Sequence, residues 1–409
     1  MNTLLMIYTK FYLLLIGFLI IRGTESTGTC SKKSSEDCAS STSNGNKYSE
    51  EANGEFEKYE AIIDAAKREY EPCTDNICKC YNQVISKDLK PFRSGINEES
   101  IRNIKSKGTK YQIIDNKLYR ENDCLFPARC SGVEHYLLKL LHKVNNTEFI
   151  LNTRDWPQIF QHHGPHGPVF SFSKTDDYLD IMYPAWAFWE GGPAISLYPK
   201  GIGRWDQHRK LLGQVGNETK WNDKMSKAFF RGSRTSSERD ALILLSRENP
   251  VLVDAQYTKN QAWKSDADTL HAPPAPEVSF EEHCKYKYLF NFRGVAASFR
   301  LKHILLCKSL VFHVGNDWIE FFYPFLRPWI HYIPVERDAS KEKIKELLEF
   351  FENHQDLAQQ IANNGYNFIW NNLQLKHVDC YWLNLIKRYT KLLKYKPTLG
   401  EGMKEIVGK

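Results

Sequence analysis

The chain has 409 residues, of which 42% are hydrophobic, 25% charged and 13% aromatic. This balance excludes a wholly disordered chain, and the length predicts two to three domains. Lys and Arg number 55 against 49 Asp and Glu, a net charge of +6, and no concentrated basic patch indicates a nucleic-acid partner. The mild excess suits an anionic ligand held by a few local arginines.

The N-terminus has the pattern of a secretory signal. Lys10 precedes an apolar run over residues 11–21, which is too short to span a bilayer comfortably. We therefore predict a cleaved signal peptide over 1–26 and no membrane span. Residues 27–50 are rich in Ser, Thr, Gly, Asn and Lys without an apolar period, which predicts a disordered leader.

The ten cysteines are consistent with a secreted protein, because an even number of cysteines after a signal peptide indicates disulfides. The chain has no CxxC pair and no histidine cluster near its cysteines, so no metal site is expected. Asn145 and Asn217 begin glycosylation sequons, which are used only in the secretory pathway.

Hydrophobic periodicity predicts the elements of the first half. They are a helix over 56–70, a hairpin over 111–120 turning at Asp115 and Asn116, a helix over 133–144, and strands at 149–151 and 169–172.

The second half alternates more regularly. The predicted strands are 228–230, 251–253, 288–292, 310–314 and 332–335, and the predicted helices are 235–247, 296–307, 340–353, 355–372 and 380–395. Thr235 and Glu238 form a candidate capping box for the first of these helices. Alternation of this kind predicts parallel sheets covered on both faces, here two α/β domains separated near residue 205 and facing across a cleft. Ligands of such folds bind at the carboxyl ends of the strands.

Polar residues follow several of these strands. Glycine and small residues over 293–300, ending at Arg300, favour an anion, and the turn over 231–234 with Arg239 is similarly cationic. Two such turns suit a diphosphate, although on spacing alone plain turns are an equal reading. Asp155 follows the strand at 149–151 and is a candidate general base, although a capping or Arg154-paired role is the default.

Two further patterns have structural readings that we prefer. Asp266 and Asp268 form a DxD that can hold a divalent metal on a nucleotide sugar, but their polar surroundings favour a solvated loop. Aromatic residues crowd 183–189, where core packing is favoured over a sugar or peptide groove. No nucleophile elbow, HExxH or kinase motif is present.

Several long words of sequence nevertheless carry a resemblance. They are RDWPQ at 154–158, FSFSKT at 170–175, YPAW at 183–186, FWEGGP at 188–193, FRGSRT at 230–235, YTKNQAWK at 257–264 and KYKYLFNFRGVAASFR at 285–300. They closely resemble the protein O-glucosyltransferases of the Rumi type, within the CAP10-like glycosyltransferases, from about Tyr70 to Trp382.

This resemblance implies a GT-B fold of two Rossmann-like domains. The domains would be an acceptor-binding domain over 51–205 and a nucleotide-sugar-binding domain over 206–375, with a helix and tail over 376–409 packing back on the first. The implied reaction is inverting transfer of glucose from UDP-glucose to the serine of C-x-S-x-[P/A]-C in folded EGF-like modules, as in Notch-type receptors. Asp155 would be the base, with neither cofactor nor metal.

Two alternatives stay open. One is a UDP-xylose-preferring O-xylosyltransferase of the same family, and the other is a non-catalytic EGF-binding chaperone, against which the intact Asp155 and arginines argue.

The resemblance also assigns residues. The UDP-sugar contacts would be Tyr198, Ser233, Arg239, Asp254, Val295, Ala296, Ala297, Ser298, Phe299 and Arg300. The acceptor contacts would be Leu125, Phe126, Pro127, Ala128, Arg129, Ala194, Ile195, Ser196, Leu197 and Pro199. The implied disulfides are Cys73–Cys80, Cys78–Cys380, Cys124–Cys130 and Cys284–Cys307, which leaves Cys30 and Cys38 for each other or free.

The expected compartment is the lumen of the endoplasmic reticulum, and the expected state is a monomer. Members of the family commonly end in a KDEL-like retrieval signal, whereas this chain ends in EIVGK over 405–409, so secretion stays open.

Overall fold

The computed structural model describes residues 46–121, 124–192, 197–198, 202–259 and 263–408. The chain divides into a short unit, Met1–Ala52, and a large compact unit, Asn53–Lys409. The predicted signal peptide lies outside the described residues, as do Cys30 and Cys38. Helix α1 (Asn46–Glu69) begins within the leader predicted over 27–50. The leader residues before the helix, 27–45, also lie outside the described residues.

The helical spacing predicted from residue 56 is confirmed in α1. Tyr59 and Ile63 are buried, and the Tyr59 hydroxyl donates to Glu346 Oε1 at 2.8 Å. The ring of Phe56 packs edge-on against that of Phe350, with 5.6 Å between centroids. The buried face of α1 therefore packs on α10 (Lys341–Asn353).

The first sheet is mixed, in the order β13-β2-β1-β3-β4-β6. Its strands are β1 (Thr109–Ile114), β2 (Lys117–Glu121), β3 (Thr147–Leu151), β4 (Val169–Ser171), β6 (Ile181–Met182) and β13 (Met403–Ile406). Only the β3–β4 and β4–β6 pairs are parallel. The predicted parallel pairing is therefore found for β3, β4 and β6, and β1 and β2 form the antiparallel hairpin predicted over 111–120. Asp115 and Asn116 adopt φ of 48° and 63°, the predicted tight turn, and such a turn pairs successive strands antiparallel.

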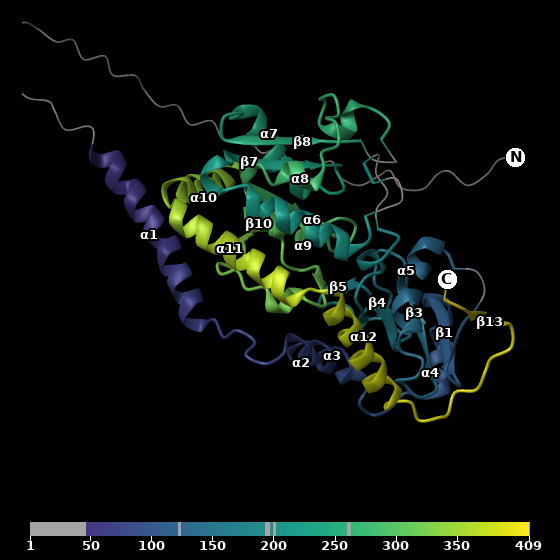
Figure 1. The fold of residues 1–409 in the computed structure, drawn as a ribbon. Coiled ribbons are helices and arrows are strands. Elements are labelled where there is room, and N and C mark those ends of the chain that lie inside the picture. The colour runs from purple at the N-terminus through teal and green to yellow at the C-terminus, as the bar shows by residue number, and fades with distance from the viewer. Residues whose placement is uncertain (1–45, 122–123, 193–196, 199–201, 260–262, 409) are drawn as a thin grey trace, which may run out of the picture. The chain divides into compact units, whose positions relative to one another are not determined.

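Helices cover this first sheet. They are α2 (Ile77–Cys80), α3 (Asn82–Asp88), α4 (Glu98–Asn103), α5 (Pro127–Leu138) and α12 (Leu375–Thr390), with short helices η1 (Lys90–Phe92), η2 (Lys105–Lys107) and η3 (Trp186–Phe188). Helix α5 begins six residues before the predicted start, because a proline is well suited to the first helical position. Helix α12 packs against α2, α3 and α5, so the C-terminal helix does return to the first half (Figure 1).

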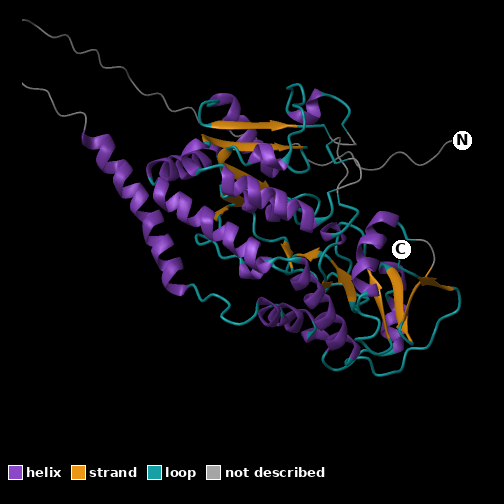
Figure 2. Ribbon diagram, viewed as in Figure 1, coloured by secondary structure: helices purple, strands orange, loops and turns teal. Residues whose placement is uncertain are grey.

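The second sheet is wholly parallel, in the order β12-β10-β9-β7-β8. Its strands are β7 (Met225–Gly232), β8 (Val253–Tyr257), β9 (Tyr286–Phe292), β10 (Leu310–Val314) and β12 (Ile333–Val335). Every residue of β10 is buried, as expected of a central parallel strand covered on both faces. The predicted α/β class is confirmed, and Figure 2 shows the strands gathered in separate groups among the helices.

The helices of the second half are α6 (Trp205–Glu218), α7 (Asp240–Glu248), α8 (Phe280–His283), α9 (Leu301–Ile304), α10 and α11 (Gln355–Asn372). Short helices are η4 (Trp221–Asp223), η5 (Ser237–Arg239), η6 (Asp266–Thr269), η7 (Leu305–Cys307) and η8 (Tyr323–Phe325). Helices α10 and α11 match their predicted ranges almost residue for residue.

Three local predictions are wrong. The Thr235–Glu238 capping box is not formed, because α7 begins at Asp240 and Glu238 pairs with Arg293 at 2.8 Å. The helix predicted from residue 296 begins at Leu301, so the preceding segment is a turn. Strand β8 begins at Val253, so Asp254 lies near the start of this strand and not at its carboxyl end.

A two-stranded sheet connects the halves. Strand β5 (Ser173–Lys174), from the first half, pairs with β11 (Ile319–Glu320), from the second. Beside it the Ser173 hydroxyl accepts a hydrogen bond from the backbone N–H of Ala297 at 3.3 Å. Residues of both halves share one hydrophobic core, so the two sheets are held in a single compact body.

The four disulfides implied by the resemblance are all present, namely Cys73–Cys80, Cys78–Cys380, Cys124–Cys130 and Cys284–Cys307. Of these, Cys78–Cys380 ties α12 to the first helices across 302 residues of sequence. Within the described part of the chain, no helix has the length and apolar character needed to cross a membrane.

Candidate active site

A cleft of about 920 Å³ is lined by residues of both halves. The predicted site residues that line it are Phe126, Pro127, Ala128, Arg129, Asp155, Tyr198, Ser233, Arg239, Val295, Ala296, Ala297, Ser298, Phe299 and Arg300. Leu125, Leu197 and Asp254 are described but are not part of this lining. Ala194, Ile195, Ser196 and Pro199 lie outside the described residues. The structure thus brings most of the predicted residues together.

Asp155 is presented to the cleft by a tight turn after β3. The Asn152 side chain accepts from the Arg154 N–H at 2.9 Å and donates to the Trp156 carbonyl at 2.8 Å, which folds the chain around Asp155. An asparagine that bonds backbone groups two and four residues ahead is a common way to stabilise such a turn. The ion-pair partner of Asp155 is Arg129, at 2.9 Å, and not the neighbouring Arg154.

In the second half of the cleft lining, two arginines form no ion pair with a carboxylate within the described ranges. Arg239 is 6% exposed, and its guanidinium donates to the carbonyls of Ser233 and Arg293. Arg300 donates to the Arg231 carbonyl at 2.6 Å. One nitrogen of each, Nε of Arg239 and Nη1 of Arg300, is buried with no hydrogen-bond partner among the residues that the structure describes.

Electrostatics agree with an anion site. Burial lowers the pKa of Arg239 to about 10, and burial together with the charge of Arg239 lowers the pKa of Arg300 to about 9. A shift in this direction means that burial in the folded protein disfavours these charges. A bound anion would relieve that penalty, and a diphosphate carries enough negative charge to face both guanidinium groups.

The turn over residues 293–300 shapes the floor of this site. The Gly294 N–H bonds to the Ala296 carbonyl at 2.9 Å, while the Ala297 N–H is held by Ser173. Gly232 permits the close approach of Arg300, since a Cβ there would lie 3.1 Å from Arg300 Nη2 and 2.9 Å from the Phe230 ring. Because α9 has only four residues, we assign the anion preference to the arginines rather than to a helix dipole.

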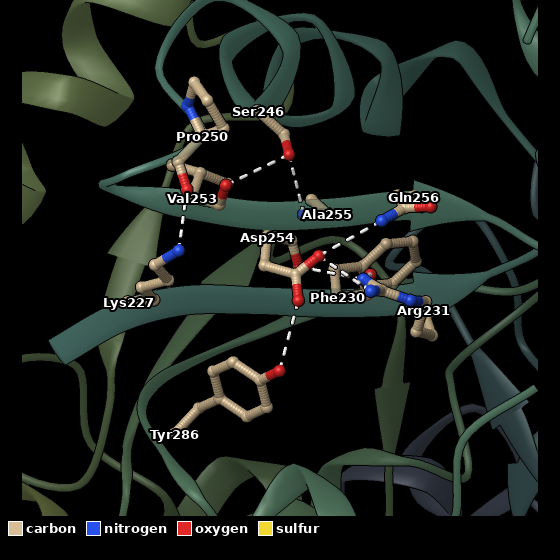
Figure 3. Close-up of polar contacts among 10 residues, drawn as sticks. All are labelled: Lys227, Phe230, Arg231, Ser246, Pro250, Val253, Asp254, Ala255, Gln256 and Tyr286. Carbon is tan, nitrogen blue, oxygen red and sulfur yellow. Dashed lines mark hydrogen bonds and ion pairs between the residues drawn. The ribbon is translucent and has the colours of Figure 1, made fainter. Parts of the chain in front are cut away.

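Asp254 does not line the cleft but forms an ion pair with Arg231, which does. Figure 3 shows its carboxylate facing Arg231 on the adjacent strand, with Arg231 Nη2 to Oδ1 at 2.7 Å and the Tyr286 hydroxyl to Oδ2 at 3.1 Å. Arg231 itself lines the cleft. A direct contact of Asp254 with the sugar-nucleotide donor stays a prediction. In the structure, Asp254 contacts Arg231, and Arg231 lines the cleft.

The sequence patterns missed an aromatic wall at one end of the cleft. Tyr198 stacks on Phe280 at 5.9 Å between centroids, and its hydroxyl accepts from the Phe280 N–H at 3.3 Å. Burial raises the pKa of Tyr198. His283 donates from Nδ1 to the Ser279 carbonyl, at 2.7 Å, and burial lowers its pKa to about 3, so it lines the cleft as a neutral ring. Phe280 and His283 belong to the four-residue helix α8, whose sequence FEEH was the only local signal for this wall. Four residues are too few to show a hydrophobic period, so the sequence patterns did not predict it.

Comparison with known proteins shows which family the chain belongs to. A model of glycosyl transferase family 90 matches residues 73–409, which is most of the chain. The chain belongs to glycosyl transferase family 90. The "O-glucosyltransferase rumi homolog" of Aedes aegypti is 59% identical over 350 residues, 85% of this chain and 87% of that protein. "Protein O-glucosyltransferase 1" of Homo sapiens is 55% identical over 358 residues, 86% and 91% of the two chains. The resemblance predicted from the sequence motifs is confirmed.

A solved structure with partial likeness is that of Anabaena HepE in complex with UDP and glucose. It has 10% identity and a TM-score of 0.33 over 62% of this chain and 74% of that one. With a TM-score and a sequence identity this low, the likeness supports no conclusion about this chain.

Exposed apolar side chains lie beside the cleft. The loop closed by Cys124–Cys130 borders the cleft, and its Leu125 and Phe126 are 58% and 37% exposed. Leu197 is also exposed, at 44%. Large apolar side chains left in water beside a cleft are typical of a surface that binds another protein.

The DxD has a local structural role. Asp268 accepts from the Lys264 N–H at 2.8 Å and caps η6 together with Ser265, and neither Asp266 nor Asp268 lines the cleft. The solvated-loop reading is therefore the one that fits this segment.

Proposed function

We propose that this protein transfers glucose from UDP-glucose, with inversion, to the serine of C-x-S-x-[P/A]-C in folded EGF-like modules such as those of Notch-type receptors. The names of its relatives support protein O-glucosylation. The observation that carries the proposal is a single cleft lined by Asp155 from one half and, from the other half, by Arg239 and Arg300, neither of which forms an ion pair within the described residues.

The reaction needs one base and one leaving-group site. The serine Oγ forms a bond to the anomeric carbon while the bond from that carbon to the UDP oxygen breaks, and the bonding electrons leave with UDP. The serine proton passes to Asp155. Attack from the face opposite the leaving group inverts the configuration, which fits a base and a diphosphate site contributed by different halves.

Arg239 and Arg300 would stabilise the negative charge that develops on the departing diphosphate. Their guanidinium groups offer several donors in fixed geometry and need no bound metal to carry positive charge. We therefore propose that the reaction proceeds without a metal or other cofactor.

The proposed setting is the lumen of the endoplasmic reticulum. The four disulfides support an oxidising compartment, where EGF-like modules also fold. The exposed apolar residues Leu125 and Phe126 support docking of a folded module beside Asp155.

The proposal is tested by incubating a folded EGF-like module with purified protein and UDP-glucose, with UDP-xylose in parallel, and weighing the module by mass spectrometry. We expect a hexose on the module with wild-type protein. Asp155→Asn should lower turnover about 10²–10⁴-fold, because proton removal is lost, and should spare UDP binding. The matched control is Asp176→Asn, an exposed carboxylate that, among the residues the structure describes, pairs only with Lys87. Unchanged turnover in Asp155→Asn would remove that residue from its role.

A further inference from the structure

The two oxygens of the Asp155 carboxylate have different surroundings. Oδ1 accepts from Arg129 Nη1 at 2.9 Å, whereas Oδ2 has no hydrogen-bond partner in the described part of the chain. The same nitrogen of Arg129 donates to the Thr153 carbonyl at 2.7 Å. The guanidinium therefore fixes the carboxylate relative to the backbone turn that carries it, and only Oδ2 is left for a substrate.

Arg129 is itself held on several sides. Its guanidinium carbon lies 4.3 Å from the ring centroid of Phe126 and 4.6 Å from that of Trp186. Arg129 lies in the first turn of α5, which the Cys124–Cys130 disulfide ties to the segment before the helix. The backbone beside it is packed tightly, since a Cβ on Gly191 would lie 2.6 Å from the Ala128 carbonyl carbon, and Gly191 adopts φ +76°.

We propose that Arg129 is a positioning residue for the base: it holds Asp155 by Oδ1 so that Oδ2 points to the serine hydroxyl. This inference rests on the proposed function, and it gives Arg129 a role beyond the acceptor contact expected from the resemblance. Arg129 reaches the reacting atoms only through Asp155.

The arrangement also links acceptor docking to the base. Phe126 presents one side to solvent at 37% exposure and packs its ring against Arg129. An acceptor that covers Phe126 therefore covers the arginine that orients Asp155. A group held in this way acts on turnover rather than on donor affinity, because the UDP site lies on the other half.

The test compares three variants with wild type. Arg129→Met keeps an unbranched apolar side chain but removes the guanidinium that lies over Phe126 and Trp186, and Arg129→Lys keeps a cation. Arg154→Met is the matched control, since Arg154 is next to Asp155 in sequence and is exposed, and within the described ranges its side chain donates a hydrogen bond only to the Lys107 carbonyl, at 3.3 Å. For each we measure kcat and KM for the EGF-like module and for UDP-glucose, and the thermal shift caused by UDP as a check on folding.

We expect Arg129→Met to lower kcat about 10- to 100-fold, the loss typical of a misplaced catalytic group, with KM for UDP-glucose unchanged. Arg129→Lys should lie between the two, and Arg154→Met should match wild type. Guanidinium ion at millimolar concentration should restore part of the kcat of Arg129→Met and none of that of Asp155→Asn, which a purely structural role would not produce.

A rise in KM for the module without a fall in kcat would reduce Arg129 to an acceptor contact and overturn the positioning role. If wild-type protein is active and Arg129→Met has the same kcat, the positioning role of Arg129 is overturned while the proposed function stands. An inactive wild-type protein would overturn the proposed function and this inference with it.

Discussion

Replacing Arg300 by Met tests the anion site by its opposite effects on the empty and the occupied protein. Arg300 holds a charge that burial disfavours, because burial and the charge of Arg239 lower its pKa by more than three units, to about 9. At about 1.36 kcal/mol per pKa unit this shift corresponds to roughly 5 kcal/mol. Removing the charge also removes the hydrogen bond to the Arg231 carbonyl and the contact with the Phe230 ring, together worth about 2–4 kcal/mol.

The net expectation is that Arg300→Met stabilises the empty protein by roughly 2 kcal/mol, which for a chain of this size raises Tm by a few degrees. Affinity for UDP should move the other way. Loss of one charged hydrogen-bonding group costs about 1.5–3 kcal/mol, which is roughly a 10- to 150-fold weaker Kd. Thermal unfolding with and without UDP, together with titration calorimetry, measures both quantities.

Arg293→Met is the matched control, because this arginine belongs to the same turn but is paired. It bonds Glu238 at 2.8 Å, and Glu238 is 8% exposed, with Arg337 Nε next at 3.8 Å. Its removal should lower Tm, since a buried carboxylate is left poorly compensated, and should spare the UDP affinity. If Arg300→Met lowered Tm as Arg293→Met does and left Kd unchanged, the uncompensated-charge account of the cleft would be refuted.

Two further predictions follow from the polar interior. Asp254→Asn should destabilise the protein by roughly 1–2 kcal/mol and raise KM for UDP-glucose several-fold, because Arg231 loses its 2.7 Å partner; an unchanged KM would show that Asp254 does not act through Arg231. His283 and His313 are buried and neutral, with pKa values lowered by burial to about 3 and about 4, so only the unfolded chain gains their protons between pH 6.5 and those values. Stability measured by denaturant should therefore fall by roughly 2 kcal/mol per histidine from pH 7 to pH 5, and His313→Gln should flatten that slope; the same slope in both proteins would contradict the assignment.

Periodic elements were predictable because periodicity records which face of an element is buried. The ranges of α10, α11 and β10 follow directly from their apolar spacing. The turn at Asp115 and Asn116 was predictable for a different reason, since these residue types tolerate the left-handed conformation that the turn requires.

Predictions that depended on a partner far away in sequence fared less well. Glu238 matched a local capping box but is drawn away by Arg293, 55 residues on. Strand β13 carries no signal of its own, because its partner β2 lies about 285 residues earlier and supplies the missing hydrogen bonds.

The sequence by itself determined the family, the disulfide framework and the residue types of the site, since long ungapped words and cysteine positions survive without coordinates. Only the tertiary structure decided that Asp155 pairs with Arg129 rather than with its neighbour Arg154, and that Arg239 and Arg300 share one cleft in which, among the described residues, neither forms an ion pair. The reason is physical: chain spacing fixes what a residue can do, whereas sheet order and packing fix which distant groups it meets, and charge compensation depends on the latter.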